Sequence, residues 1–149
     1  MTDAPYRHHT SVEVRFRDLD ALRHVNNAVY LTYFEHARLR YLRDVIGIAS
    51  IKHLAMVLAS ITCDYLSPVH MGEELEIATR VDWIGRTSLG MSHVARAVRD
   101  DREVARADSV LVSYDYRANR PQPVSAAWRA SFTEFEGRSL DRERAVAPA

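Results

Sequence analysis

The side chains best suited to chemistry are concentrated in one short segment, residues 17–27, which reads R-D-L-D-A-L-R-H-V-N-N. This segment precedes a stretch with helical periodicity, and the start of a helix presents backbone N–H groups that bind anions or oxyanions. A carboxylate a few residues upstream can act in the same pocket as a general base or a nucleophile. The residue types alone also permit a simpler interpretation, in which Asp18 and Asp20 form a turn and Asn26 or Asn27 caps the helix.

The elements that position this segment are predicted from hydrophobic periodicity. Residues 10–16 alternate, with Val12, Val14 and Phe16 on one face, which predicts a half-buried strand. Apolar side chains at helical spacing predict a long helix over residues 28–46, and Gly47 is a suitable stop.

Four strands and a short helix are predicted further along the chain. The strands cover residues 54–66, 74–84, 88–98 and 104–116, and the helix covers residues 125–135. In the second of these strands we expect Val81 and Trp83 on the buried face, with Arg80 and Asp82 on the exposed face. The order of elements predicts an α+β domain over residues 1–136, followed by a flexible tail over residues 137–149.

The composition is that of one ordinary globular domain of 149 residues. Twenty Lys and Arg residues balance twenty Asp and Glu residues, which excludes the broad basic surface of a nucleic-acid or anionic-membrane binder. The sequence has neither a signal-peptide core nor the roughly 18 consecutive apolar residues of a membrane helix. A single cysteine, Cys63, excludes an intrachain disulfide. We therefore expect a cytoplasmic protein without nucleic-acid or membrane partners.

Two apolar patterns predict an oligomer. The long helix carries a second apolar stripe, and residues 110–112 of the last strand are apolar in succession, so both elements are expected to be buried on two sides. The members of the helical stripe are Leu31, Leu39, Leu42 and Ile46.

Residues 18–35 contain the pattern D-L-D-x3-H-V-N-N-x2-Y-x4-E. The pattern resembles the hotdog-fold acyl-CoA thioesterases of the 4-hydroxybenzoyl-CoA thioesterase family, and it is similar to the acyl-ACP thioesterase motif D-L-D-x-N-x-H-V-N-N. The resemblance extends over residues 10–135. It implies a hotdog fold, in which a five-stranded antiparallel sheet wraps around one long central helix, with a short C-terminal helix.

The resemblance also implies a catalytic site. Asp20 matches the catalytic carboxylate, and the backbone N–H at about Asn27 matches the group that polarises the thioester carbonyl. His24 is expected to support this loop or to touch substrate. Glu35 is a second candidate acid, because another branch of hotdog thioesterases uses a helix-borne carboxylate, although a pairing of Glu35 with Arg38 explains it more simply.

The same resemblance predicts substrate contacts and shared sites. The turn Gly85-Arg86-Thr87-Ser88 matches the basic, hydroxyl-bearing turn that contacts the CoA phosphates. Tyr30, Val57, Leu58 and Ser60 are expected to line the acyl pocket. The family's sites lie between two subunits, so we expect a homodimer or homotetramer. We expect no cofactor apart from the CoA of the substrate, and the histidines show no metal-ligand spacing.

The carrier and the reaction class leave alternatives open. Leu22 stands where the acyl-ACP motif has asparagine, which favours CoA as the carrier. Hotdog hydratases and dehydratases use the spacing D-x-N-P-x-H, whereas His24 lies four residues after Asp20 with no intervening proline. A non-catalytic acyl-CoA-binding domain is the third hypothesis, and the retention of Asp20 argues against it.

Overall fold

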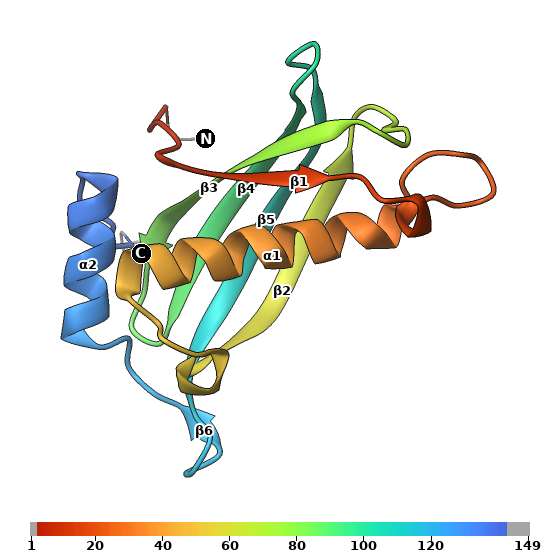
Figure 1. The fold of residues 1–149 in the computed structure, drawn as a ribbon. Helices are drawn as coiled ribbons and strands as arrows, with labels where there is room; N and C mark the ends of the chain where they lie inside the picture. The colour runs from red at the N-terminus through yellow and green to blue at the C-terminus, as the bar shows by residue number, and fades with distance from the viewer. Residues whose placement is uncertain (1–2, 143–149) are drawn as a thin grey trace, which may run out of the picture.

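The computed structural model describes residues 3–142 and is built around one long helix, α1 (Asn27–Ile46), as Figure 1 shows. The side chain of Asn26 caps its start by accepting a hydrogen bond from the backbone N–H of Ala28 at 2.9 Å. Gly47 ends it in the left-handed conformation, with φ of 68°, which glycine adopts without the penalty of a Cβ. The long helix predicted from periodicity is confirmed.

An antiparallel sheet wraps around α1 in the strand order β1-β3-β4-β5-β2 (Figure 1). The strands are β1 (His8–Glu13), β2 (Met56–Tyr65), β3 (Glu74–Ile84), β4 (Ser88–Ala97), β5 (Glu103–Asp115) and β6 (Arg120–Pro121). The predicted hotdog architecture is confirmed, but the sheet has six strands rather than five. The sixth, β6, is a two-residue strand that pairs with the end of β5.

The core consists of two clusters, one near each end of α1. Phe34, which is fully buried, belongs to the cluster near the start of the helix, and Tyr41 belongs to the cluster near its end. The second helix, α2 (Ala126–Glu136), covers the second cluster with Phe132. Leu42, from the stripe expected to face a partner, lies in this chain's own core, whereas Leu31 is 39% exposed.

The first strand is displaced from its predicted position. It covers residues 8–13 instead of 10–16, and Phe16, expected to be buried, is 80% exposed. The backbone N–H of Arg15 donates to the carboxylate of Asp18 at 2.9 Å, and the chain turns there into a single 3-10 turn, Phe16–Asp18. This local hydrogen bond ends the strand before the alternation does. A second 3-10 turn, Ile51–His53, precedes β2.

A β-bulge in β3 overturns the predicted alternation of that strand. The register shifts between Val81 and Trp83, so that Ile84 is buried in the core while Trp83 is only partly buried. Arg80, expected on an exposed face, is also buried, because residues near the N-terminus cover it and Tyr6 places its ring against the guanidinium. Periodicity cannot locate a bulge, because one inserted residue reverses every side chain after it.

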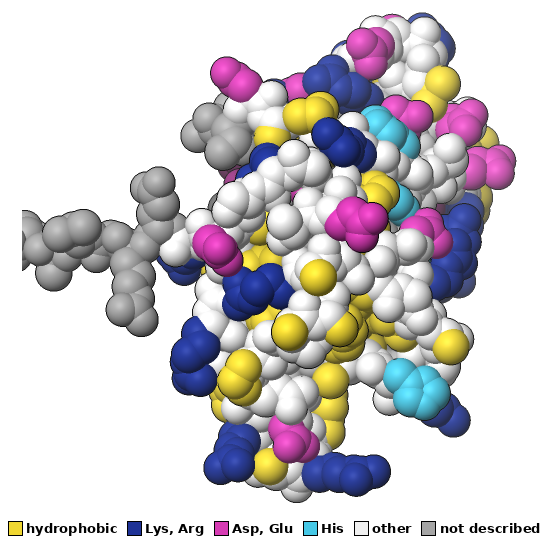
Figure 2. All heavy atoms as spheres, turned by 90° about the vertical axis from the view of Figure 1, so that its left-hand side faces the viewer, with side chains coloured by type: hydrophobic (Ala, Val, Ile, Leu, Met, Phe, Trp, Pro, Cys, Tyr) yellow, Lys and Arg dark blue, Asp and Glu magenta, His cyan; other side chains and the backbone are white. Residues whose placement is uncertain are grey.

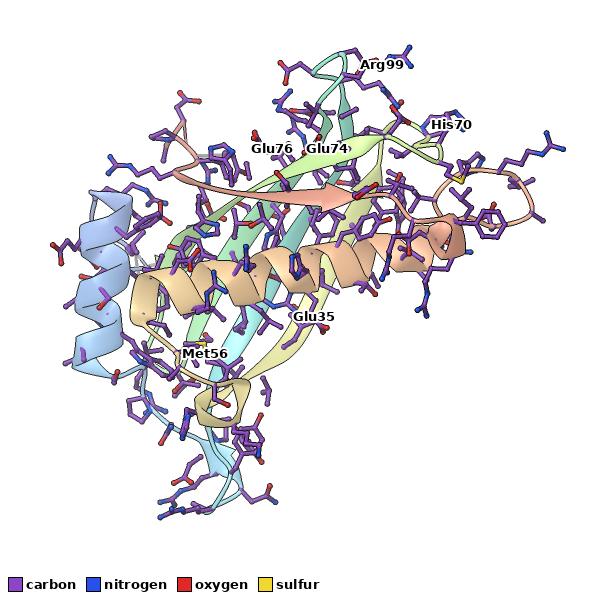
Figure 3. The ribbon with its side chains drawn as sticks, viewed as in Figure 1. Glu35, Met56, His70, Glu74, Glu76 and Arg99 are labelled. Atoms are coloured by element: carbon purple, nitrogen blue, oxygen red, sulfur yellow. The ribbon has the colours of Figure 1, made fainter. Side chains whose placement is uncertain are left out.

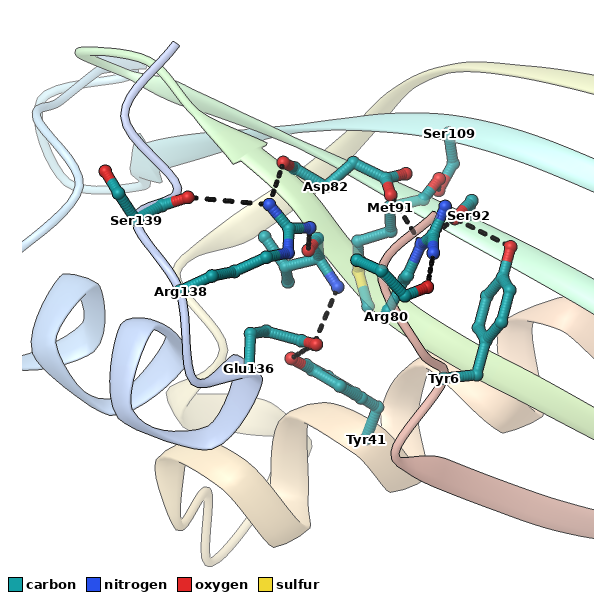
Figure 4. Close-up of polar contacts among 12 residues, drawn as sticks. Tyr6, Tyr41, Arg80, Asp82, Met91, Ser92, Ser109, Glu136, Arg138 and Ser139 are labelled. Atoms are coloured by element: carbon teal, nitrogen blue, oxygen red, sulfur yellow. Dashed lines mark hydrogen bonds and ion pairs between the residues drawn. The ribbon is translucent and has the colours of Figure 1, made fainter. Parts of the chain in front are cut away.

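Side chains from residues 136–138 form hydrogen bonds with the backbone at this bulge and stabilise it (Figure 4). The carboxylate of Glu136 accepts hydrogen bonds from the backbone N–H of Val81 at 3.0 Å and from the Tyr41 hydroxyl at 2.5 Å. Arg138 donates to the carbonyls of Val81 and Asp82 at 3.0 and 3.2 Å.

Residues 137–142 continue along the edge of β3, which β1 pairs only over residues 74–79. The backbone N–H of Ile84 donates to the carbonyl of Leu140 at 2.6 Å, and Leu140 is buried. The ordered fold therefore extends past residue 136, where we expected a flexible tail to begin. Residues 143–149 lie outside the described residues.

On the face that carries α2, basic and acidic side chains are interspersed rather than segregated by sign (Figure 2). This agrees with the balanced formal charge of the sequence. Within residues 3–142, no helix has both the length and the apolar character required to span a bilayer.

Replacing Glu136 with alanine is expected to lower the free energy of unfolding by about 3 kcal/mol. Two buried donors, the Val81 N–H and the Tyr41 hydroxyl, then lose their acceptor, and each such loss costs about 1–3 kcal/mol. Urea unfolding measures the change. Glu134→Ala is the matched control, because Glu134 is an exposed carboxylate on the same helix. Equal stabilities of the two variants would show that the bulge does not depend on Glu136.

Candidate active site

Asp20 is held in a small closed loop that leads into the start of α1. Leu19 and Val25 form an isolated antiparallel bridge, which closes residues 20–24. Inside this loop the N–H of Asp20 donates to the carbonyl of His24 at 3.2 Å, and the N–H of Arg23 donates to the carbonyl of Asp20 at 3.0 Å. The helix cap follows directly after Val25, so the loop and the helix N-terminus form one unit.

Asp18, just before the loop, and Asp20, inside it, have opposite roles in the structure. Asp18 is 2% exposed, and both of its carboxylate oxygens are engaged: one accepts from the Tyr33 hydroxyl at 2.7 Å, the other from the Arg15 guanidinium at 3.0 Å. The Asp20 carboxylate accepts one hydrogen bond, from the backbone N–H of Leu22 at 2.8 Å, through one oxygen. Its second oxygen has no hydrogen-bond partner among residues 3–142. Asp20 is therefore the carboxylate available for chemistry, and Asp18 is an anchor.

The ionisation of Asp18 follows from the same contacts. Burial alone would raise its pKa, but hydrogen bonds from Arg15 and Tyr33 outweigh burial and hold the pKa below its ordinary value. Asp18 is therefore ionised at neutral pH.

Tyr65 contacts the start of α1 and was not among the predicted site residues. Its hydroxyl donates to the carbonyl of Asn27 at 2.8 Å, so β2 fixes the first peptide of the helix. The N–H of Asn27 has no acceptor within the helix, because a helix leaves its first N–H groups unpaired. Tyr30, predicted to line the acyl pocket, is buried, and its ring centroid lies 5.3 Å from that of Tyr65. The sequence offers no signal for Tyr65, because its role depends on a contact between distant segments.

His24 lies at the same end of the molecule, half-buried, with its ring 6.3 Å from that of His70. His70 belongs to the connection between β2 and β3, which reaches the end of α1 that carries the loop (Figure 3). The Nδ1 of His70 donates to the carbonyl of Arg23 at 3.3 Å. The connection therefore supports the loop from outside.

Glu35 is not brought together with Asp20. Its side chain is 62% exposed and projects from α1 (Figure 3), with one oxygen 3.9 Å from the Arg38 guanidinium. Eight residues separate it from Asn27, which corresponds to about 12 Å along the helix. The pairing with Arg38 agrees with the simpler interpretation of this residue.

The predicted CoA-binding turn lies near the C-terminal end of α1, whereas the loop of Asp20 lies at the N-terminal end. Residues 85–87 connect β3 to β4, and the N–H of Gly85 donates to the carbonyl of Ser88, the first residue of β4, at 2.7 Å. The side chain of Arg86 is exposed, and Thr87 is partly buried. Because α1 spans about 30 Å, Arg86 and Asp20 of one chain do not form a single site (Figure 1).

The remaining predicted pocket residues lie on the sheet edge formed by β2. Val57 is half-buried, whereas Leu58 is 42% exposed and Ser60 is exposed. The register with β5 shifts between Leu58 and Ser60, which marks a bulge in the edge strand. These side chains lie away from the loop of Asp20 within one chain.

Metal binding and thiol chemistry have little support in the part of the chain that the structure describes. Residues 3–142 contain no group of three or more His, Cys, Asp or Glu side chains placed to hold a metal ion. Burial raises the pKa of the Cys63 thiol, which favours its protonated form.

A family model described as the thioesterase-like superfamily matches residues 14–132. The chain belongs to this superfamily. Its structure is similar to a thioesterase from Thermus thermophilus, solved in complex with coenzyme A and Zn, with 39% identity and a TM-score of 0.81. That match covers 89% of this chain and 96% of the other. The superfamily is broader than the 4-hydroxybenzoyl-CoA thioesterase family named above, and membership of that narrower family stays a prediction.

Three curated relatives share parts of the sequence. The long-chain acyl-CoA thioesterase FadM of Escherichia coli is 28% identical, over 85% of this chain and 97% of FadM. The chloroplastic acyl-acyl carrier protein thioesterase ATL3 of Arabidopsis thaliana is 26% identical, over 86% of this chain and 68% of ATL3. The uncharacterized protein YsmA of Bacillus subtilis is 35% identical, but the match spans only 56% of each chain.

Asp18→Asn is expected to lower the free energy of unfolding at pH 7 by about 2 kcal/mol, because hydrogen bonds to a charged group are weakened. A carboxyl group with a lowered folded-state pKa stabilises the protein above its unfolded value of 3.8 and loses this effect as the pH falls through the folded value. The difference between wild type and variant should therefore shrink below pH 4. Urea unfolding across pH measures it. A difference that does not change with pH would contradict the ionised anchor.

Proposed function

We propose that the protein is a thioesterase that hydrolyses acyl-CoA thioesters to the free acid and CoA. The observation that carries this proposal is the carboxylate of Asp20, with one unengaged oxygen, in a loop that leads into the N-terminus of α1. A thioester carbonyl is more reactive than an amide, and a thiolate is a moderate leaving group. One carboxylate and one oxyanion donor can therefore be sufficient.

Each part of the site has a chemical role in this proposal. The N–H of Asn27, at the positive end of the helix dipole, stabilises the oxyanion that forms on the thioester carbonyl. Asp20 either attacks the carbonyl carbon directly or takes a proton from the attacking water, and both roles require the same position. Tyr65 donates to the carbonyl of Asn27 and so holds the backbone next to this N–H, and His24 is part of the loop.

Coenzyme A is the carrier that we favour. The Thermus thermophilus neighbour was solved with coenzyme A, and FadM, matched over nearly its whole length, acts on acyl-CoA. Leu22 also departs from the acyl-ACP motif. The similarity to ATL3 makes acyl-ACP the comparison substrate. A thiol-release assay with matched acyl-CoA and acyl-ACP substrates decides between them, and no thiol release from either would support a binding domain or a hydratase.

The separation of Arg86 from Asp20 supports a site shared between subunits. In a two-fold dimer with antiparallel helices, the start of α1 in one chain approaches the β3–β4 turn of the other. Arg86, Thr87 and Ser88 of one subunit would then hold the CoA phosphates of a substrate whose thioester lies at Asp20 of its partner. We therefore propose a homodimer, or a homotetramer formed from two such dimers.

Asp20→Asn is expected to lower kcat by at least about 10²-fold, because it removes the base or nucleophile and keeps the size and turn chemistry of the side chain. The measurement is the steady-state rate on an acyl-CoA substrate, with unfolding by urea as a check on the fold.

Asp115→Asn is the matched control for this substitution. The Asp115 carboxylate accepts from the backbone N–H of Arg117 at 2.8 Å, the same contact with the residue two positions ahead that Asp20 makes with Leu22, but it lies on β5. The control should keep its full rate. A folded Asp20→Asn protein with wild-type kcat would remove Asp20 from the mechanism and leave Glu35 as the candidate acid.

Arg86→Ala is expected to raise KM for acyl-CoA with little change in kcat. A phosphate contact remote from the thioester stabilises the ground state and the transition state alike. A short thioester without the nucleotide should be hydrolysed as before. An equal loss on both substrates would show that Arg86 does not contact CoA.

Mixed dimers test the shared site directly. Each mixed dimer of Asp20→Asn and Arg86→Ala subunits contains one site with both wild-type groups, provided that these groups come from different chains. Mixing the two variants under exchange conditions should restore hydrolysis with the wild-type KM. A mixture that behaves as the sum of its two components would show that each chain supplies a whole site.

A further inference from the structure

A row of polar side chains crosses the sheet underneath α1. In the strand register His8 of β1 lies opposite Thr79 of β3, and Thr79 lies opposite His93 of β4. Opposed residues of antiparallel strands project from the same face. Thr79 and His93 are fully enclosed, with Oγ1 of Thr79 3.0 Å from Nδ1 of His93.

Arg38 of α1 lies over this row. It lies one helical turn from Phe34 and one from Tyr41. The ring centroid of Phe34 is 5.5 Å from that of His93, and the ring centroid of Tyr41 is 5.3 Å from that of His8. The Arg38 side chain is 6% exposed. Its ion-pair partner within residues 3–142 is Glu35, at 3.9 Å through Nη2, and that carboxylate is mostly in solvent. Such an exposed, distant carboxylate compensates a buried guanidinium weakly.

Four enclosed polar atoms in this region have no hydrogen-bond partner among the described residues. They are Nη1 of Arg38, Nε2 of His93, Nδ1 of His8 and Oγ1 of Thr10. Thr10 lies two residues after His8 and therefore on the same face of β1. Buried polar atoms without a partner are rare, and each costs about 1–3 kcal/mol. Their concentration under one helix indicates that a small hydrogen-bonding species lies among them.

The donors in the row favour an anion over a water molecule. Burial, with a smaller effect from Arg38, lowers the pKa of His93 to about 3, so the imidazole is neutral at pH 7. When the Thr79 hydroxyl donates to Nδ1, the single N–H of His93 is at Nε2 and is a second donor beside Nη1 of Arg38. Water can accept both hydrogen bonds but leaves the guanidinium charge uncompensated, which is costly in an apolar interior.

We propose that Arg38, His93 and Thr10 bind one small monovalent inorganic anion, of the size of chloride, between α1 and the sheet. The anion accepts hydrogen bonds from the guanidinium and the imidazole and compensates the buried charge. It joins α1 to β1 and β4 through one ion. This site is separate from the loop of Asp20 and does not depend on thioesterase activity.

The test is the halide dependence of thermal unfolding, measured at constant ionic strength while sodium gluconate is replaced by sodium chloride or sodium bromide. Binding to the folded state raises the Tm in a saturable way. Crystals grown with bromide should show one anomalous peak between Arg38 and His93. Absence of both the Tm response and the peak would overturn the proposal and assign the region to water.

Two variants establish that these residues hold the ion. Arg38→Met keeps the length of the side chain and removes the charge, and the apparent halide affinity should fall at least about tenfold, as expected for a charged hydrogen bond. Arg43→Met is the control, because Arg43 is exposed on the same helix and pairs with Asp44. Equal halide responses in the two variants would overturn the site. Should Arg38→Met fail to fold, Thr79→Val, which removes the hydroxyl that sets the His93 tautomer, should weaken the halide response.

Discussion

The hydrogen bond between the Tyr33 hydroxyl and the Asp18 carboxylate, 2.7 Å long and out of solvent, joins two segments that must meet for the candidate site to exist. One is the turn after β1, which Arg15 ties to the same carboxylate; the other is the second turn of α1. Only residues 19–26 lie between Asp18 and the start of α1, so fixing both ends of this segment leaves the loop of Asp20 little freedom. Preorganised groups of this kind stabilise a transition state without rearrangement of the protein.

The contrast between the two aspartates is a matter of solvation. The burial of Asp18 is tolerated because three donor groups surround its charge: the backbone N–H of Arg15, the guanidinium of Arg15 and the hydroxyl of Tyr33. A carboxylate engaged in this way has no oxygen left for a substrate. Asp20, two positions later, makes one short-range contact and remains partly in water. Asp18 therefore has a structural role, whereas Asp20 keeps an oxygen free for the chemistry that we propose, and the difference depends on which of the two faces α1.

Much of the fold could be predicted from local patterns. Periodicity identified α1, and the bounds of β3 were predicted correctly because alternation and turn residues coincide there. The patterns failed where a distant group determines the local structure. The position of Trp83 follows from a bulge that the distant C-terminal segment stabilises. The exposure of Phe16 has a local cause, the contact of Arg15 with Asp18, which hydrophobic alternation does not encode. The motif indicated Asp20 and Asn27, whereas Tyr65 and Arg38 acquire their environments only through tertiary packing.

The hydrogen bond between Glu136 and the β3 bulge also affects how the chain folds while it is being synthesised. The N–H of Val81 and the carboxylate of Glu136 are 55 residues apart, so the ribosome completes β3, β4 and β5 long before the group that satisfies β3 emerges. Until then the Tyr41 hydroxyl and the edge of β3 at residues 80–84 have no partner from this segment, and that edge can pair with another nascent chain. The end of α2 and residues 137–142 are therefore made late, and they cover the edge of β3 that is open to pairing with another chain until then.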